Sequence, residues 1–198
     1  MTSRLQELAR ARERPQPPAE EERCDLCAEP IPPEHRHLLD LESRRLLCAC
    51  RACSILFDRS GAGGGHYRLI PDRVVALDGV GLDEIPVEMA FFFHSSAAGR
   101  VVAFYPSPLG ATESLLDVDD RVLEELEPDV EALLVNRTRG RREFWIVPVD
   151  RCYELVGLVR THWRGFTGGE EVWGALDDFF DRLRKEATWQ GSRSASRT

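Results

Sequence analysis

Lysine and asparagine are almost missing from this chain of 198 residues. Of its 26 basic side chains all but Lys185 are arginine, and Asn136 is the only asparagine. A phosphate-binding P-loop requires a Gly-Lys-Ser/Thr sequence, and Schiff-base chemistry requires a lysine in a suitable pocket. Lys185 lies in the charged stretch 182–186 and has neither setting. The sequence therefore excludes P-loop nucleotide hydrolysis and lysine-based covalent catalysis.

Long apolar runs are also absent. A run such as Met89–Phe93 is far shorter than the roughly 20 residues that a bilayer-spanning helix needs. Residues 1–14 contain several charges and no apolar core, so we expect no signal peptide, no membrane association and a cytoplasmic location. In that reducing compartment, the six cysteines are expected to be metal ligands or buried thiols rather than disulfides.

Positive charge is in deficit, since the net charge is −8 and the isoelectric point is near 5.2. A chain of this charge repels phosphate, which argues against binding to nucleic acid or to an anionic membrane. Four arginines do gather within residues 137–142, around Gly140. This segment is expected to be a solvated turn, with docking of an acidic partner as the alternative.

Two Cys-x-x-Cys pairs form the strongest motif, Cys24 with Cys27 and Cys50 with Cys53. The 22 residues between the pairs are close to the usual spacing of four-thiolate zinc sites. Residues 24–60 contain too few large apolar side chains to fold by burial alone, whereas a structural zinc ion supplies folding free energy. The pattern predicts a closed tetrahedral zinc site without an open position for catalysis.

The ligand set leaves alternatives open, because Cys48 is a fifth nearby thiol. Cys48 can be buried, can replace Cys50 as a ligand, or can help to hold an iron–sulfur cluster. Rubredoxin-like iron is a further alternative, although that family has glycine after its cysteine pairs. His35 and His37 are expected to be hydrogen-bonded polar side chains that serve as reserve ligands.

The order of a cysteine turn, a strand and a second cysteine turn at a helix start resembles a treble-clef or zinc-ribbon module. HNH-type nucleases share this arrangement, and their general base lies in an Asp-His-Ile/Val motif. This chain has only residues 34–37, Glu-His-Arg-His, at that place, and Ser54 replaces a metal-binding residue. A hydrolase is therefore the third-ranked functional class.

The remaining pattern predicts an α+β fold, in which an antiparallel-sheet domain carries C-terminal helices. Strands are expected at 66–70, 73–77, 87–94, 100–105, 130–137 and 142–147. Asp150 is expected to cap a helix and residues 167–170 to form a capping box for the last one. The predicted division is a disordered arm at 1–23, a cysteine module at 24–60, an α+β domain at 66–188 and a disordered tail at 189–198.

Cys152 and His162 are the remaining candidates for nucleophilic chemistry. They lie ten positions apart on one predicted helix, which separates them by about 15 Å along its axis, too far for a hydrogen bond. We therefore expect Cys152 to be a buried thiol.

The segments Cys24–Asp58 and 152–180 resemble an uncharacterised bacterial family of about this length, so the resemblance covers most of the chain. Genes of that family lie beside nickel–iron hydrogenase clusters, which implies an accessory or maturation role and a hydrogenase subunit or maturation factor as partner. The main hypothesis is a non-enzymatic accessory protein whose zinc module binds another protein. The alternative is an iron-binding electron carrier or cluster-handling protein.

Overall fold

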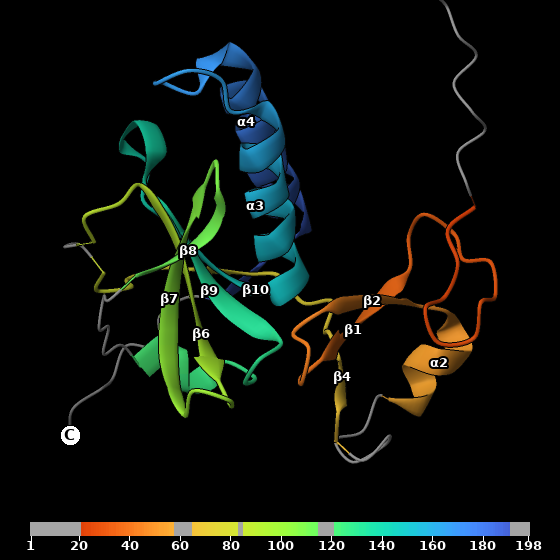
Figure 1. The fold of residues 1–198 in the computed structure, drawn as a ribbon. Helices are drawn as coiled ribbons and strands as arrows, with labels where there is room; N and C mark the ends of the chain where they lie inside the picture. Colours follow the sequence, from red (N-terminus) through yellow and green to blue (C-terminus); the bar gives the residue numbers. More distant parts are fainter. Residues whose placement is uncertain (1–20, 58–64, 83–84, 115–120, 191–198) are drawn as a thin grey trace, which may run out of the picture.

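The computed structural model describes residues 21–57, 65–82, 85–114 and 121–190. Two sheets and two long C-terminal helices, α3 (Val149–His162) and α4 (Gly169–Glu186), confirm the expected α+β class. Figure 1 shows the larger sheet on the left, the two helices beside it and a small cysteine-bearing unit on the right.

Seven strands form the larger sheet: β5 (Val75–Leu77), β6 (Met89–Ser95), β7 (Arg100–Ser107), β8 (Gly110–Ser114), β9 (Glu131–Asn136), β10 (Glu143–Pro148) and β11 (Thr188–Gln190). Their order across the sheet is β11-β5-β10-β9-β6-β7-β8. All neighbours are antiparallel except β11, which runs parallel to β5. The central strand β9 is buried along its whole length.

Both faces of this sheet are covered by apolar side chains. Phe91 and Leu134 pack on the side of α3 and α4, whereas their neighbours Phe92 and Leu133 belong to a second core on the opposite side. The 3-10 helix η1 (Arg121–Glu125) contributes Leu123 to that second core. Because side chains alternate along a strand, the same strands serve both cores.

Each long helix buries an apolar stripe at helical spacing, but the caps predicted for both helices are wrong. The buried stripe residues are Cys152, Val156 and Val159 on α3 and Val172, Leu176, Phe179, Phe180 and Leu183 on α4. Pro148 is the last residue of β10 and directly precedes α3, and no side chain caps the start of either helix. At the start of α4, Gly168 has φ +86°, and a Cβ there would lie 2.8 Å from Val172. Only glycine fits this turn.

The smaller sheet has the order β2-β1-β4 and is antiparallel. It consists of β1 (Arg36–Asp40), β2 (Leu46–Ala49) and β4 (Tyr67–Leu69), and the short helix α2 (Arg51–Leu56) follows β2. The glycine-rich segment 61–65, which separates the predicted module from the predicted domain, lies outside the described residues except for Gly65. Since β4 follows that segment and pairs with β1, main-chain bonds connect the predicted module to residues of the predicted domain. The domain division itself stays a prediction.

The cysteine-bearing unit, residues 21–57 with β4, packs against the larger sheet and the start of α3. The buried residues of this contact are Leu39, Ile70, Val130 and Val149. At its edge, the guanidinium of Arg44 lies 5.4 Å from the ring centroid of Phe93 and donates a hydrogen bond of 3.1 Å to Ser95 Oγ. Apolar burial and a cation–π contact therefore hold the unit in place.

The described strands β1, β8 and β11 lie where the sequence pattern predicts none. β8 carries alternating half-buried and exposed residues with little apolar content, so its periodicity is weak. β11 contains Trp189 and Gln190, the first residues of the expected disordered tail, and residues 191–198 are outside the described residues. Residues 1–20 of the expected arm are outside them too, while Arg23 forms an isolated bridge with Pro30.

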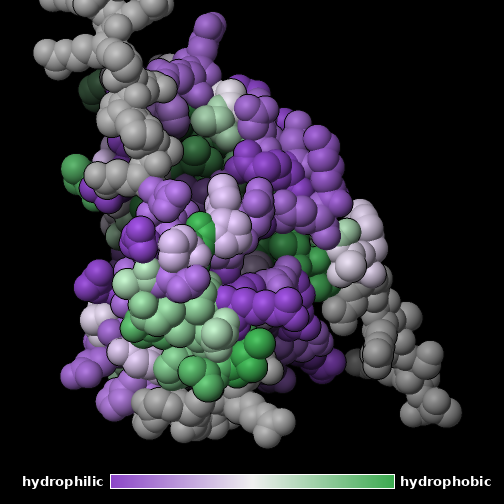
Figure 2. Space-filling view, turned by 90° about the vertical axis from the view of Figure 1, so that its right-hand side faces the viewer, coloured by the Kyte–Doolittle hydropathy of each residue, from purple (hydrophilic) through white to green (hydrophobic). Residues whose placement is uncertain are grey.

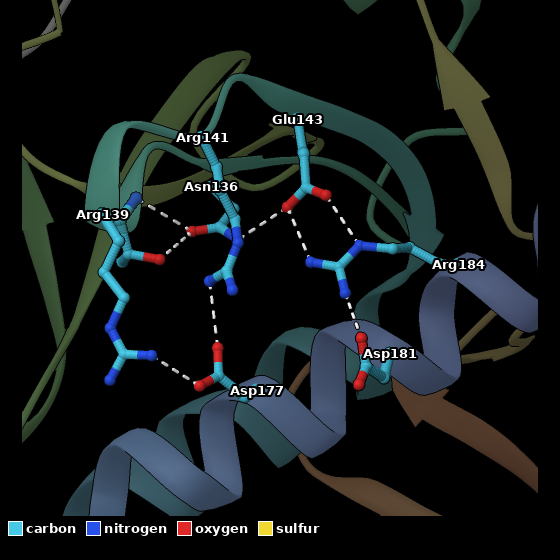
Figure 3. Close-up of polar contacts among 8 residues, drawn as sticks. Asn136, Arg139, Arg141, Glu143, Asp177, Asp181 and Arg184 are labelled. Atoms are coloured by element: carbon cyan, nitrogen blue, oxygen red, sulfur yellow. Dashed lines mark hydrogen bonds and ion pairs between the residues drawn. The ribbon is translucent and has the colours of Figure 1, made fainter. Parts of the chain in front are cut away.

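The arginines of the β9–β10 connection pair with α4. Figure 3 shows Arg139 and Arg141 donating to the two carboxylate oxygens of Asp177, at 2.7 and 3.0 Å. Beside them, Glu143 accepts two hydrogen bonds from Arg184, at 2.7 and 3.1 Å. Asp177 of the same chain is thus the acidic partner of two of the clustered arginines, Arg139 and Arg141.

One ion pair is anchored in the core. Glu131 of β9 is only 2% exposed, and Arg73 reaches both of its oxygens, with Nε 2.5 Å from Oε1 and Nη2 2.8 Å from Oε2. The hydrogen bond to Glu131 raises the pKa of Arg73. Removing one partner of such a pair leaves the other charge buried and uncompensated.

We predict that Arg73→Ala lowers the free energy of unfolding by about 3 kcal/mol, since it leaves the Glu131 carboxylate buried without its cation. Equilibrium unfolding in urea measures the change. Arg100→Ala is the matched control, because Arg100 and Glu113 are both more than half exposed and their pair is worth about 0–1 kcal/mol. Equal losses in the two variants would contradict the prediction.

Candidate metal centre

The first cysteine pair flanks a tight turn. The N–H of Ala28 donates to the carbonyl of Cys24 at 2.8 Å, and the N–H of Cys24 donates to the carbonyl of Glu29 at 2.8 Å. Ala28 has φ +61°, in the left-handed region that favours glycine. The turn after Cys27 therefore has the backbone of a glycine-containing knuckle with alanine in its strained position.

The second pair lies at the start of α2. Cys50 is the residue before the helix, and its Sγ accepts a hydrogen bond from the N–H of Cys53 at 3.4 Å. The N–H of Ser54 donates to the carbonyl of Cys50 at 2.9 Å. This first helical turn orients both sulfurs toward the same side.

Asp25 joins the two turns. Its N–H donates to the carbonyl of Cys48 at 2.9 Å, and its carboxylate accepts from the N–H of Cys48 at 2.6 Å. The first turn is thereby fixed beside the strand that leads into the second. Sequence spacing contains no signal for this contact, because Asp25 and Cys48 are 23 positions apart.

The sulfur atoms of Cys24, Cys27, Cys50 and Cys53 all lie within 4.8 Å of one another. The distance from Cys27 Sγ to Cys50 Sγ is 3.7 Å. Four thiolates at about 2.3 Å from a tetrahedral zinc ion are about 3.8 Å apart. The four side chains therefore have the spacing that a four-thiolate metal site requires. None of the six cysteines, all of which lie in the described ranges, forms a disulfide.

The thiols of the cluster differ in acidity. Burial raises the pKa of Cys24, but backbone hydrogen bonds, chiefly from Cys50, outweigh it and lower the pKa to about 6. A backbone hydrogen bond from Glu29 lowers the pKa of Cys27, yet contacts with Cys24 and Cys50 raise it above its ordinary value. Burial and contacts with the neighbouring thiols raise the pKa of Cys53 to about 12. Cys24 is thus the most acidic of these three thiols.

Cys48 and the two histidines lie in a second group beside this cluster. Cys48 is opposite His37 in the pairing of β2 with β1. Its sulfur lies within 4.8 Å of ring nitrogens of His35 and His37. Cys48 therefore groups with the two histidines and lies apart from the cluster of Cys24, Cys27, Cys50 and Cys53.

The expectation for Cys152 is confirmed. Its side chain is fully buried in the core between α3 and the sheet, and burial raises the pKa of its thiol well above the ordinary value. His162 instead lies 2.9 Å from Glu171. At the position that departs from the nuclease pattern, Ser54 donates its hydroxyl to the carbonyl of Arg51.

Asp150 is a site residue that the sequence pattern assigned to another role. It lies in the first turn of α3, where its Oδ2 is 2.8 Å from His37 Nδ1. The two residues are 113 positions apart, so no local spacing connects them.

Fold and site together define an α+β protein with a four-cysteine cluster that can hold a metal ion. The chain belongs to the family of unknown function DUF5947, whose model matches residues 23–187. Neither a curated protein nor a solved structure matches the chain. Among the described residues, no helix is long and apolar enough to span a membrane.

We predict that zinc affinity rises with pH between 6 and 9. Cys27 and Cys53 must lose protons to bind the ion, and each released proton contributes about a tenfold gain per pH unit. Cys24, whose pKa is about 6, contributes little to the proton release on zinc binding above that pH. Competition with a chromophoric chelator measures the affinity, and a weakly buffered titration counts the protons.

Two single variants provide the control. At pH 7.5, Cys53→Ser should release one proton fewer than the unsubstituted chain, whereas Cys24→Ser should bind zinc more weakly with nearly the same proton release. Equal loss of proton release in both variants would contradict the assigned order of acidity.

Proposed function

We propose that the cluster of Cys24, Cys27, Cys50 and Cys53 holds one zinc ion and that the ion is structural. The distance of 3.7 Å between Cys27 Sγ and Cys50 Sγ carries this proposal, because it is the spacing of a closed tetrahedral thiolate shell. Four protein ligands leave no coordination position for a substrate. The ion would therefore stabilise the fold rather than carry out a reaction.

The small apolar core of the cysteine-bearing unit supports the same role. Its buried residues are Cys24, Ile31, Leu38, Ala49 and Cys53. Two of these five are cysteines of the cluster, so little aliphatic surface remains to hold the turns together. Zinc binding supplies folding free energy in such small units.

Elemental analysis and visible absorption spectroscopy test the proposed structural zinc. The protein is purified without oxygen and dialysed against a mild chelator. We predict one retained zinc per chain and no colour. The double variant Cys24→Ser, Cys27→Ser should retain none and unfold at lower temperature, because the shell loses half of its thiolates. Cys152→Ala is the control, since its thiol lies in the main core.

Iron in place of zinc, with charge-transfer absorption that disappears in the double variant, would overturn the structural zinc assignment. That result would support the electron-transfer alternative, because rubredoxin-type iron is also bound by four thiolates. Full metal retention by the double variant would place the ion elsewhere in the chain.

We further propose that the zinc-bound unit belongs to an accessory protein and contacts a protein partner. Ile55 and Leu56 of α2 are 64% and 66% exposed. Figure 2 turns the side of the molecule that bears α2 toward the viewer and shows a green apolar patch in its lower part. A groove of about 1050 Å³ lined in part by Ile31, Cys50 and Ile55 lies beside the cluster. Exposed apolar residues near a polar rim are typical of a contact surface.

The resemblance to a family encoded beside nickel–iron hydrogenase genes suggests the partner, a hydrogenase subunit or a maturation factor. We predict that the zinc-loaded chain co-elutes with one of these proteins in size-exclusion chromatography. Ile55→Ser with Leu56→Ser should weaken binding at least about tenfold, because the two side chains lose apolar contact.

Leu109→Ser with Phe166→Ser is the matched control, since both side chains are almost fully exposed away from α2. If both double variants weakened partner binding equally, that result would contradict the proposal that α2 provides the contact surface. Absence of binding to every hydrogenase protein tested would overturn the partner proposal and leave the structural zinc untouched.

A further inference from the structure

Strand geometry places three metal-binding side chains together outside the four-cysteine cluster. His35 lies one residue before β1, and His37 is the second residue of β1. Side chains two positions apart in extended chain point to the same face. Cys48 lies directly opposite His37 on the antiparallel strand β2. Cross-strand partners on one face bring their side chains into contact range.

The donor atoms of this group are close enough to share an ion. One ring nitrogen of each histidine and the sulfur of Cys48 lie within 4.8 Å of one another. The two imidazole rings meet edge to face, with centroids 4.8 Å apart and planes at 72°. Ligands of a tetrahedral zinc ion are about 3.3–3.8 Å apart, so small side-chain rotations complete the geometry.

Hydrogen bonds at Nδ1 fix both rings. His35 Nδ1 lies 2.9 Å from the carbonyl oxygen of Pro32, and His37 Nδ1 lies 2.8 Å from Asp150 Oδ2. A carbonyl or carboxylate oxygen accepts a hydrogen bond from Nδ1–H, so Nε2 of the neutral ring carries a free lone pair. This arrangement is typical of zinc-binding histidines, whose second ring nitrogen donates to a carboxylate or a backbone carbonyl.

A buried nitrogen without a partner is the independent sign of a missing ligand. The side chain of His35 is only 7% exposed, and its Nε2 is buried without a hydrogen bond in the structure. Leaving such a polar atom unpaired costs about 1–3 kcal/mol, so native proteins rarely do so. An ion bound to Nε2 removes this cost.

We propose that His35, His37 and Cys48 form a second metal site, which binds a zinc-type divalent ion through two imidazole nitrogens and one thiolate. Mixed nitrogen and sulfur donors favour zinc over magnesium or calcium. Three protein ligands leave one coordination position for water or another small ligand. The site goes beyond the proposed structural zinc, with which it shares no side chain.

A pocket between the cysteine-bearing unit and α3 adjoins the two histidines. This pocket has a volume of about 550 Å³, and its lining includes His35, His37, Asp150 and Tyr153. Solvent reaches the site from there, since the side chain of His37 is 30% exposed. The second ion is thus exchangeable, whereas the four-thiolate shell encloses the first.

The full chain provides the test. After dialysis against the mild chelator, the chain keeps its first zinc, and zinc is added back in equilibrium dialysis. We expect uptake of one further zinc per chain. His35→Gln with His37→Gln should take up none, and His66→Gln with His162→Gln should match the unsubstituted chain. The control histidines lie outside the group.

Two further variants examine the ligands more closely. Asp150→Asn keeps a hydrogen-bonding group near His37 but loses the carboxylate, so it should weaken uptake of the second zinc about 10–100-fold. With cobalt in place of zinc, Cys48→Ser should lose the thiolate absorption that the second equivalent produces and keep that of the first.

Failure of the unsubstituted chain to take up a second zinc would overturn this proposal, as would equal uptake by the His35 and His37 double variant. Retention of the first zinc in every one of these variants separates such a failure from a failure of the structural zinc proposal.

Discussion

The convergence of four cysteine sulfurs is the constraint on which the N-terminal unit depends. Cys24 and Cys27 come from a strained turn at Ala28, and Cys50 and Cys53 come from the start of α2. The β1–β2 hairpin spans the interval between the two turns, and the main-chain N–H and the carboxylate of Asp25 both bond to Cys48 and hold the turns side by side. The buried apolar cluster here is small and is partly made of the cysteines themselves. Bound metal therefore suits this unit as the element that fixes its shape.

The same hairpin connects this unit to the rest of the protein. Its first strand, β1, pairs with β4 on its other edge. Arg44, between β1 and β2, stacks on Phe93 of β6, and Leu39 is buried with Val149 at the start of α3. The His37–Asp150 contact crosses the same boundary. A metal held by the histidines would thus be coupled to the packing of α3 on the hairpin, whereas the four-thiolate cluster lies within the unit alone.

Arginine is used throughout as a partner for carboxylates. Arg73 neutralises Glu131 in the core, and Arg139 and Arg141 meet at Asp177. The planar guanidinium donates several hydrogen bonds in fixed directions, which suits the bridging of a strand connection to a helix. Two of the four arginines clustered at 137–142 therefore find their acidic partner within the chain.

The sequence alone determined the features that depend on local spacing. Cysteine turns at 24–27 and 50–53 follow from short-range geometry, and the stripes of α3 and α4 follow from helical periodicity. Tertiary contacts decided two further strands. The apolar pattern of β8 is weak, and β11 pairs with β5, which is far away along the chain. Tertiary structure also decided the role of Asp150. This residue lies in the first turn of α3 without capping it, and its carboxylate orients His37, which is 113 positions away. Local propensity cannot encode such contacts, because the free energy that selects them comes from packing between distant segments.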